Sequence, residues 1–259
     1  MEVHHHAHTS PTPDPSTGSG HRSRKKWTHY FWEFLMLFLA VFCGFMAENI
    51  REHSIEKKRE KIYMYNLVED LRADTSAYIR YTNANESAFG MVDSLMYLMN
   101  STERKSKLNR IYYLARKFTM RSDLLYTNTR TYDEMRSSGQ LRLIHNRAIS
   151  DALSRYYQSL KHIQNQNDRV TVRINEFFLT MGDIFDARTL LQISNNNLVP
   201  DNSSLRLLTE DTQQINRMLT LAQYLYSTFK YVETIAQLRL IAANKLIQLI
   251  KNEYNIRGE

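Results

Sequence analysis

Hydrophobic and polar residues divide the chain into stretches of different pattern. Residues 1–26 are polar, an almost wholly apolar run follows within 27–47, residues 48–62 are densely charged, and apolar residues recur with a helical period in 63–259. Apolar side chains spaced three and four residues apart are typical of amphipathic helices. We therefore expect an all-α protein with these four stretches as its domains.

The apolar run is YFWEFLMLFLAVFCGFMA, residues 30–47, and Glu33 is its only formal charge. About 18 residues form roughly 27 Å of helix, close to the thickness of the hydrocarbon core of a bilayer. Basic residues at 22–26 precede the run, as in a signal peptide or an uncleaved signal anchor. Phe45 stands where a cleavage site needs a small residue, and a bulky residue precedes Cys43, against a lipoprotein site. We expect a retained anchor, and no second run of this length follows.

Aromatic residues and one acid mark the start of the predicted span. Trp27, Tyr30 and Trp32 predict an aromatic belt at one membrane interface. Glu33 lies one turn inside, and we expect its carboxylate to reach back to the basic edge. The alternative for Glu33 is a buried intramembrane acid coupled to a partner or to a proton path.

Three small residues lie further along the span. Ala40 and Gly44 are four residues apart, and Ala47 follows. Small side chains let two helices approach closely in a membrane. We predict a helix–helix contact here, either in a homo-oligomer or with another membrane protein.

The orientation of the span does not follow from counting Lys and Arg, because four precede it and five follow within about 15 residues. The first four have no acidic neighbours, whereas the later five alternate with four glutamates. This favours a cytoplasmic N-terminus and a helical domain outside the cytoplasm, with the opposite orientation as the alternative.

The charged stretch 48–62 is predicted to be a solvated helical stalk. It is too polar to pack along its whole surface, and Glu48–Arg51 and Glu56–Arg59 are pairs of opposite charge at spacing three. Two isoleucines seven residues apart would allow a short parallel coiled coil.

The remaining domain is predicted to be an elongated antiparallel helical bundle. Gly139 fits a left-handed helix C-cap, Asn146 fits an N-cap, and residues 194–204 form the clearest loop. The expected helices cover about 64–100, 103–120, 128–137, 147–192 and 206–254.

Composition agrees with a helical chain. Helix breakers are scarce, with 7 Gly and 4 Pro, and only Pro200 follows the prolines of the tail. The net charge is +7, but Lys and Arg are scattered among acids, so we expect attraction to an anionic membrane surface and no nucleic acid. Cys43 is the only cysteine, so the chain cannot form an internal disulfide.

The histidines and acids give little support for a metal site. His53, His145 and His162 form no Glu-x-x-His or His-x-x-x-His pair. Histidines at 4–8 could bind a divalent metal adventitiously, and we expect a flexible tail with no dedicated metal.

Two pairs of acids could bind a cation. Asp70 and Asp74 are four residues apart, and we expect them on a solvated face opposite Leu67 and Leu71. The same interpretation applies to the acids at 183 and 186.

Catalytic motifs are absent from the sequence. The isolated glycines allow neither a phosphate-binding loop nor a nucleophile elbow. The 16 tyrosines are expected at the edge of the core, with a tyrosine-lined ligand pocket between helices as the alternative. We therefore predict no enzyme, no catalytic residue, no metal and no cofactor.

Three segments carry a resemblance to a known family. MEVHHHAH, KKWTHYFWEFLMLFLAVFCGFMAENIREH with EKKREK, and TYDEMRSSGQLRLIHNRAISDALSRYY (131–157) resemble an uncharacterised family of single-span membrane proteins from Bacteroidetes-type bacteria. The resemblance is strong over about the first 60 residues and moderate over 131–157. It implies a bacterial membrane protein with a native His-rich tail, and it adds no catalytic residues. In a bacterial inner membrane, the favoured orientation would place the N-terminus in the cytoplasm and the helical domain in the periplasm.

The function we expect is that of a membrane-anchored, non-enzymatic helical scaffold or interaction protein. Its partners would be the lipid bilayer and either a second copy or a membrane protein. The alternative is an extracytoplasmic ligand-sensing helical bundle that acts through an associated membrane protein, and a membrane-bound enzyme is the third hypothesis.

Overall fold

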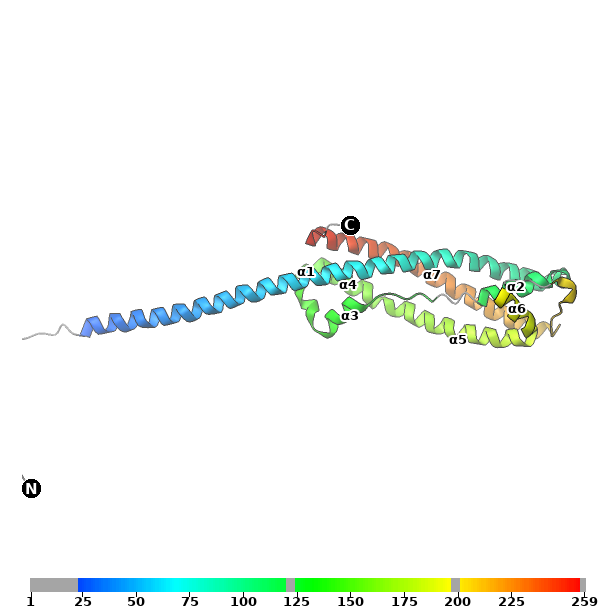
Figure 1. The fold of residues 1–259 in the computed structure, drawn as a ribbon, viewed down its shortest axis with the longest axis horizontal. Helices are drawn as coiled ribbons and strands as arrows, with labels where there is room; N and C mark the ends of the chain where they lie inside the picture. Colours follow the sequence, from blue (N-terminus) through cyan, green and yellow to red (C-terminus); the bar gives the residue numbers. More distant parts are fainter. Residues whose placement is uncertain (1–22, 120–123, 197–200, 257–259) are drawn as a thin grey trace, which may run out of the picture. The chain divides into compact units, whose positions relative to one another are not determined.

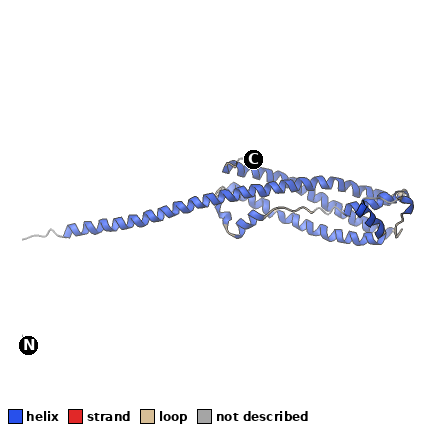
Figure 2. Cartoon of the chain, in the orientation of Figure 1, coloured by secondary structure: helices blue, strands red, loops and turns tan. Residues whose placement is uncertain are grey.

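A computed structural model describes residues 23–119, 124–196 and 201–256, and these contain helices and connecting turns but no strand (Figure 2). The expected all-α class is confirmed. Residues 1–22 of the predicted tail, which include its histidines, lie outside the described residues. The α-helices are α1 (Ser23–Asn100), α2 (Leu108–Thr119), α3 (Arg130–Ser137), α4 (Arg147–Gln158), α5 (Leu160–Ile184), α6 (Ala187–Asn196) and α7 (Thr212–Tyr254), labelled in Figure 1.

The chain separates into two compact units, Met1–Glu56 and Lys57–Glu259. The described part of the first unit is helical and strongly apolar. An 18-residue window in it has a mean hydropathy of 1.9, and none of that window is buried. Leu37, Val41 and Phe45 are 70%, 69% and 70% exposed. The first unit thus holds a helix long and apolar enough to cross a membrane, and it is unlike a core helix, which would be mostly buried.

The second unit buries its apolar side chains in two clusters. The first cluster gathers residues of α1, α3, α4, α5 and α7, among them Leu67 and Leu153. The second gathers residues of α1, α2, α5, α6 and α7, among them Leu95 and Phe177. Helices α5 and α7 contribute to both clusters and pack along each other (Figure 1).

The predicted single helix over 147–192 is wrong, because the chain turns twice within it and forms α4, α5 and α6. At the first turn, the Ser159 hydroxyl donates to the carbonyl oxygens of Arg155 and Tyr156. At the second, Phe185 is extended, with φ −112° and ψ 138°. The Asp186 carboxylate then accepts from the Thr189 N–H at 2.9 Å and so caps α6. Apolar periodicity continues across both turns, so only the capping side chains mark them.

The predicted loop at 194–204 is shorter than expected. Helix α6 extends to Asn196, and a 3₁₀ turn covers Asn202–Ser204. The centre of that prediction, residues 197–200, lies outside the described residues.

The last helix begins later than predicted, at Thr212 instead of about 206. Asp211 caps it, since its carboxylate accepts from the Gln213 N–H at 2.9 Å. The preceding segment is held by other contacts: the Leu208 N–H donates to the Ile184 carbonyl at 2.9 Å. The residues before Asp211 therefore connect helices and do not extend α7.

Two predicted caps are confirmed. Gly139 follows α3 with a φ of 70°, in the left-handed region that favours glycine. The Asn146 side chain accepts from the N–H groups of Ala148 and Ile149 and starts α4. The second predicted helix begins with a 3₁₀ turn at Arg104–Lys107 before α2.

Candidate functional site

The residues predicted to mark the membrane interface all lie on α1. Trp27, Tyr30 and Trp32 are 75%, 65% and 62% exposed, and Glu33 is exposed as well. Exposed indole and phenol rings suit a membrane interface, where one side of the ring is apolar and the other is wet. Their role as an anchor stays a prediction.

The three small residues Ala40, Gly44 and Ala47 also lie on α1 and are exposed. A Cβ atom added to Gly44 would meet nothing within 4 Å. Nothing in the described part of the first unit covers this strip, so it is open to a second helix.

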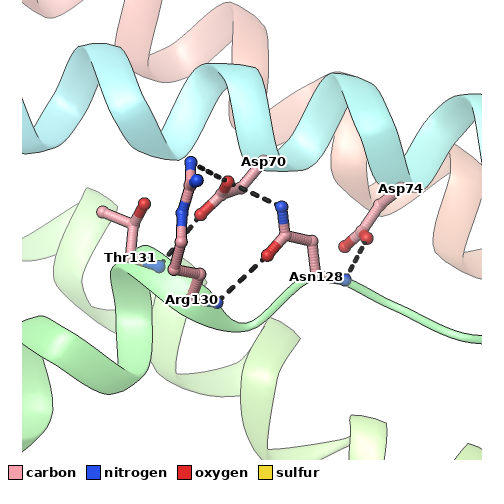
Figure 3. Close-up of polar contacts among 5 residues, drawn as sticks. All are labelled: Asp70, Asp74, Asn128, Arg130 and Thr131. Atoms are coloured by element: carbon pink, nitrogen blue, oxygen red, sulfur yellow. Dashed lines mark hydrogen bonds and ion pairs between the residues drawn. The ribbon is translucent and has the colours of Figure 1, made fainter.

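The prediction that Asp70 and Asp74 are solvated is wrong. Each is only 1% exposed, because the segment before α3 lies across them (Figure 3). The spacing already contained this information: Asp74 follows Leu67 by seven residues, which is two helical turns, so the two share a face.

Asp70 accepts hydrogen bonds from three residues at the start of α3 and in the segment before it. Its carboxylate accepts from Asn128 Nδ2 at 2.7 Å, from the Thr131 N–H at 3.0 Å and from Arg130 Nη2 at 3.3 Å (Figure 3). Because Thr131 lies in the first turn of α3, Asp70 also places a negative charge at the N-terminus of that helix.

Asp74 lies one turn further along and receives two donors. Its Oδ1 accepts from the Asn128 N–H at 2.6 Å, and its Oδ2 accepts from the Tyr156 hydroxyl at 2.7 Å. The hydroxyl of Tyr78 is 2.8 Å from that of Tyr156. Since Tyr156 gives its one proton to Asp74, Tyr78 must donate to Tyr156. We call Asp70, Asp74, Tyr78, Asn128 and Tyr156 the Asp–Tyr cluster.

Burial governs the ionisation of this cluster. It raises the pKa of the Asp74 carboxyl, although the bonds from Asn128 and Tyr156 act in the opposite direction. It also raises the pKa of Tyr78 and of Tyr156 far above the usual range, and their neighbouring acidic groups add to this. Both phenols therefore stay neutral at physiological pH, and neither supplies a tyrosinate for catalysis.

Arg239 reaches the cluster from α7. It is 8% exposed, and its Nη1 donates to the backbone carbonyl of Tyr156 at 2.6 Å. Its guanidinium carbon lies 5.5 Å from the centre of the Tyr156 ring. Among the described residues it forms no ion pair. Burial lowers its pKa, but an arginine remains charged at physiological pH.

Tyr157 lies beside the cluster and packs through its ring. The ring stacks on that of Tyr132 with centres 4.2 Å apart. Its hydroxyl is buried and has no hydrogen-bond partner in the described part of the chain. Burial raises the pKa of this phenol as well, so the group stays neutral.

A groove of about 480 Å³ lies between α4 and α7, beside Arg239. Its lining includes Ala152, Arg155, Leu238, Arg239, Lys245 and Leu249, and no acid. It borders the Asp–Tyr cluster through Tyr156. The groove has Tyr156 in its wall. Among the alternatives predicted from the sequence, the tyrosine-lined ligand pocket between helices is the most similar to it.

Another buried acid, Glu60, corrects the prediction of a solvated stalk over residues 48–62. Glu60 is 4% exposed and accepts from the His145 N–H at 3.0 Å and from the Tyr254 hydroxyl. His145 Nδ1 also lies 3.1 Å from Oε2, the other carboxylate oxygen of Glu60. Glu60 thus joins α1 to the start of α4 and the end of α7, and no local pattern in the sequence indicates these partners.

The other acids have different environments. Asp183 is exposed, as predicted, whereas Asp186 is half-buried and caps α6. Across residues 23–119, 124–196 and 201–256, no three His, Cys, Asp or Glu side chains come together as metal ligands.

Comparison of the chain with protein-family models, with curated proteins and with solved structures finds no match. The resemblance of the N-terminal segment to a family of single-span membrane proteins therefore stays a prediction.

Proposed function

We propose that the protein is a membrane-anchored helical scaffold that docks a second copy of itself or another membrane protein. The observation that carries this is the unburied apolar window of α1, with its mean hydropathy of 1.9. About 18 apolar residues left open to solvent would be costly in water, whereas a bilayer would bury them. The resemblance to single-span membrane proteins supports the same conclusion.

The second unit would be an antiparallel helical bundle that presents docking surfaces. Late residues of α1 such as Val92 share a cluster with early residues of α7 such as Leu219, and the other cluster pairs Leu67 with Ile247. This opposite order supports antiparallel packing of α1 and α7.

The Asp–Tyr cluster supports a structural role over a catalytic one. Its donors and acceptors satisfy one another, and its phenols are held neutral. Asn128 bonds to both acids and thereby holds the segment before α3 against α1. Buried polar networks with their partners in place fix one arrangement of the surrounding chain.

The strip of Ala40, Gly44 and Ala47 would be the contact within the membrane. Its side chains are small and uncovered, which suits close approach of two helices. The protein would lie in the bacterial inner membrane with the N-terminus in the cytoplasm and the second unit in the periplasm.

Purification in mild detergent tests the docking role. The full chain should elute with a stoichiometric partner or as a stable oligomer, and Gly44→Ile should reduce that association. Leu39→Ile, on another side of α1, is the matched control and should leave it intact. A monomer without partners would contradict the proposal.

Reporter fusions at Glu259 test the orientation. A periplasm-dependent reporter, alkaline phosphatase, should be active there, and a cytoplasm-dependent fluorescent protein should be dark. The reverse pattern would place the second unit in the cytoplasm and overturn this part of the proposal.

Ligand sensing through an associated membrane protein is the second candidate. The groove between α4 and α7 favours it, because the groove touches Arg239 and Tyr156. A ligand there would contact the helices that the Asp–Tyr cluster joins.

A further inference from the structure

The groove between α4 and α7 gathers three cations without an acid. Arg155 comes from α4, and Arg239 and Lys245 come from α7. None of the three forms an ion pair within the described residues. The nearby acids are engaged elsewhere: Asp151 pairs with Arg147 at 3.9 Å, and Asp74 accepts from Tyr156 behind the groove. The groove therefore carries net positive charge.

Arg239 makes this charge unusual because it is buried. Its one hydrogen bond goes to the backbone carbonyl of Tyr156, and its remaining N–H groups have no bond to a described residue. The side chain as a whole is buried, but its unbonded N–H groups are not buried atoms, so they open onto the groove. An anion in the groove would supply the missing acceptors.

The apolar part of the groove determines what kind of anion fits. Leu238 and Leu249 are 64% and 36% exposed, and Ala242 lies between them along α7. A volume of about 480 Å³ falls in the usual range for small-molecule sites. A bare inorganic anion would leave this apolar surface in water.

We propose that the groove binds an anionic amphiphile, a carboxylate with a single short acyl chain. The carboxylate would lie among Arg155, Arg239 and Lys245, and the chain would cover Leu238 and Leu249. The guanidinium of Arg239 would connect such a ligand to Tyr156 and so to the Asp–Tyr cluster.

This inference deepens the ligand-sensing candidate and rests on it. Binding is measured directly on the purified chain, so its failure leaves the docking and orientation tests unaffected. Conversely, a chain with the opposite orientation could still bind the amphiphile.

The test is fluorine NMR of octanoate tagged with a terminal trifluoromethyl group. The full chain is held in nanodiscs of zwitterionic phosphatidylcholine, and empty nanodiscs give the partition of the probe into lipid. We expect saturable binding beyond that partition. Charge reversal of two exposed groove residues, Arg155→Glu with Lys245→Glu, should weaken it about tenfold or more.

Three controls make the result specific. Arg217→Glu reverses an exposed cation of α7 outside the groove and should leave the affinity within about twofold. Ala242→Phe fills the groove without changing its charge and should also abolish binding. The corresponding alcohol should bind at least about tenfold more weakly than the carboxylate. Circular dichroism confirms that each variant is folded.

Several results would overturn the proposal. One is equal affinity of the wild-type and charge-reversed chains, which would mean lipid partition only. Another is displacement of the probe by inorganic phosphate at an equal concentration, which would indicate a simple anion site. Equal binding of the alcohol would show that the cations play no part.

Discussion

Replacing Asp74 with alanine tests whether the Asp–Tyr cluster holds the second unit together. The substitution removes the acceptors of two hydrogen bonds, one from the Asn128 N–H and one from the Tyr156 hydroxyl. Both donors would remain in the interior, where water cannot easily replace the lost carboxylate. The change should therefore loosen the segment before α3 as well as lower global stability.

The magnitude follows from the two bonds. Hydrogen bonds to a charged group contribute about 1.5–3 kcal/mol each. The burial that raises the pKa of Asp74 offsets part of this, because the carboxylate itself is costly to bury. We expect a net loss of about 3 kcal/mol in the free energy of unfolding, well above the ~0.5 kcal/mol typical of a surface change.

Urea unfolding of the full chain in detergent, followed by far-UV circular dichroism, measures this loss. Asp183→Ala is the matched control, because that acid is exposed on α5 and should cost little. Hydrogen exchange should also show faster exchange of the Asn128 and Thr131 N–H groups in the Asp74→Ala chain. If Asp74→Ala is no more destabilising than Asp183→Ala, the reasoning about the cluster is refuted.

The remaining predictions concern other parts of the second unit. The pKa of Asp74 is raised in the folded state, so the folded chain binds more protons than the unfolded chain between the unfolded pKa, about 4, and the raised folded pKa. Over that range, wild-type stability should fall with rising pH relative to Asp74→Asn. Urea titrations at several pH values check this, and a trend of the opposite sign would mean a lowered pKa. Glu60→Ala should cost about 2–4 kcal/mol and speed hydrogen exchange at the start of α4, since it removes the acceptor for His145 and Tyr254. Unchanged hydrogen exchange at the start of α4 would contradict this prediction for Glu60→Ala. Gly139→Ala should cost about 1 kcal/mol in the same urea assay because φ is 70° at that position, and a stabilised variant would show that the turn is not left-handed.

Sequence periodicity predicted much of the core of the second unit. Met64, Leu67, Val68 and Leu71 are buried, because side chains three and four residues apart share one face of a helix. The spacing rule is less reliable at the edges of a buried helix face. Ile79 fits the same spacing but is 48% exposed.

The helix breaks were missed for a local reason. Apolar spacing runs through Ser159 and Asp186, and no proline marks either turn. Each turn depends on a capping hydroxyl or carboxylate that competes with helical hydrogen bonds. The pattern Asp186-x-x-Thr189 was the available signal.

The polar sites depend on contacts distant in sequence. Tyr156 lies 82 residues from Asp74, and Tyr254 lies 194 from Glu60. The helical spacing of Asp74 from Leu67 could have indicated its burial, but nothing local indicates which donors it meets. The same holds for the groove, where α4 and α7 bring Arg155 and Arg239 together.

Alkaline carbonate extraction of cell membranes is the most direct test of the proposed anchor. If residues 30–47 span the bilayer, the full chain should stay in the pellet, because high pH strips peripheral proteins and leaves inserted helices in place. Release of the chain into the supernatant would contradict a retained span, whether through cleavage of a signal peptide or through peripheral attachment.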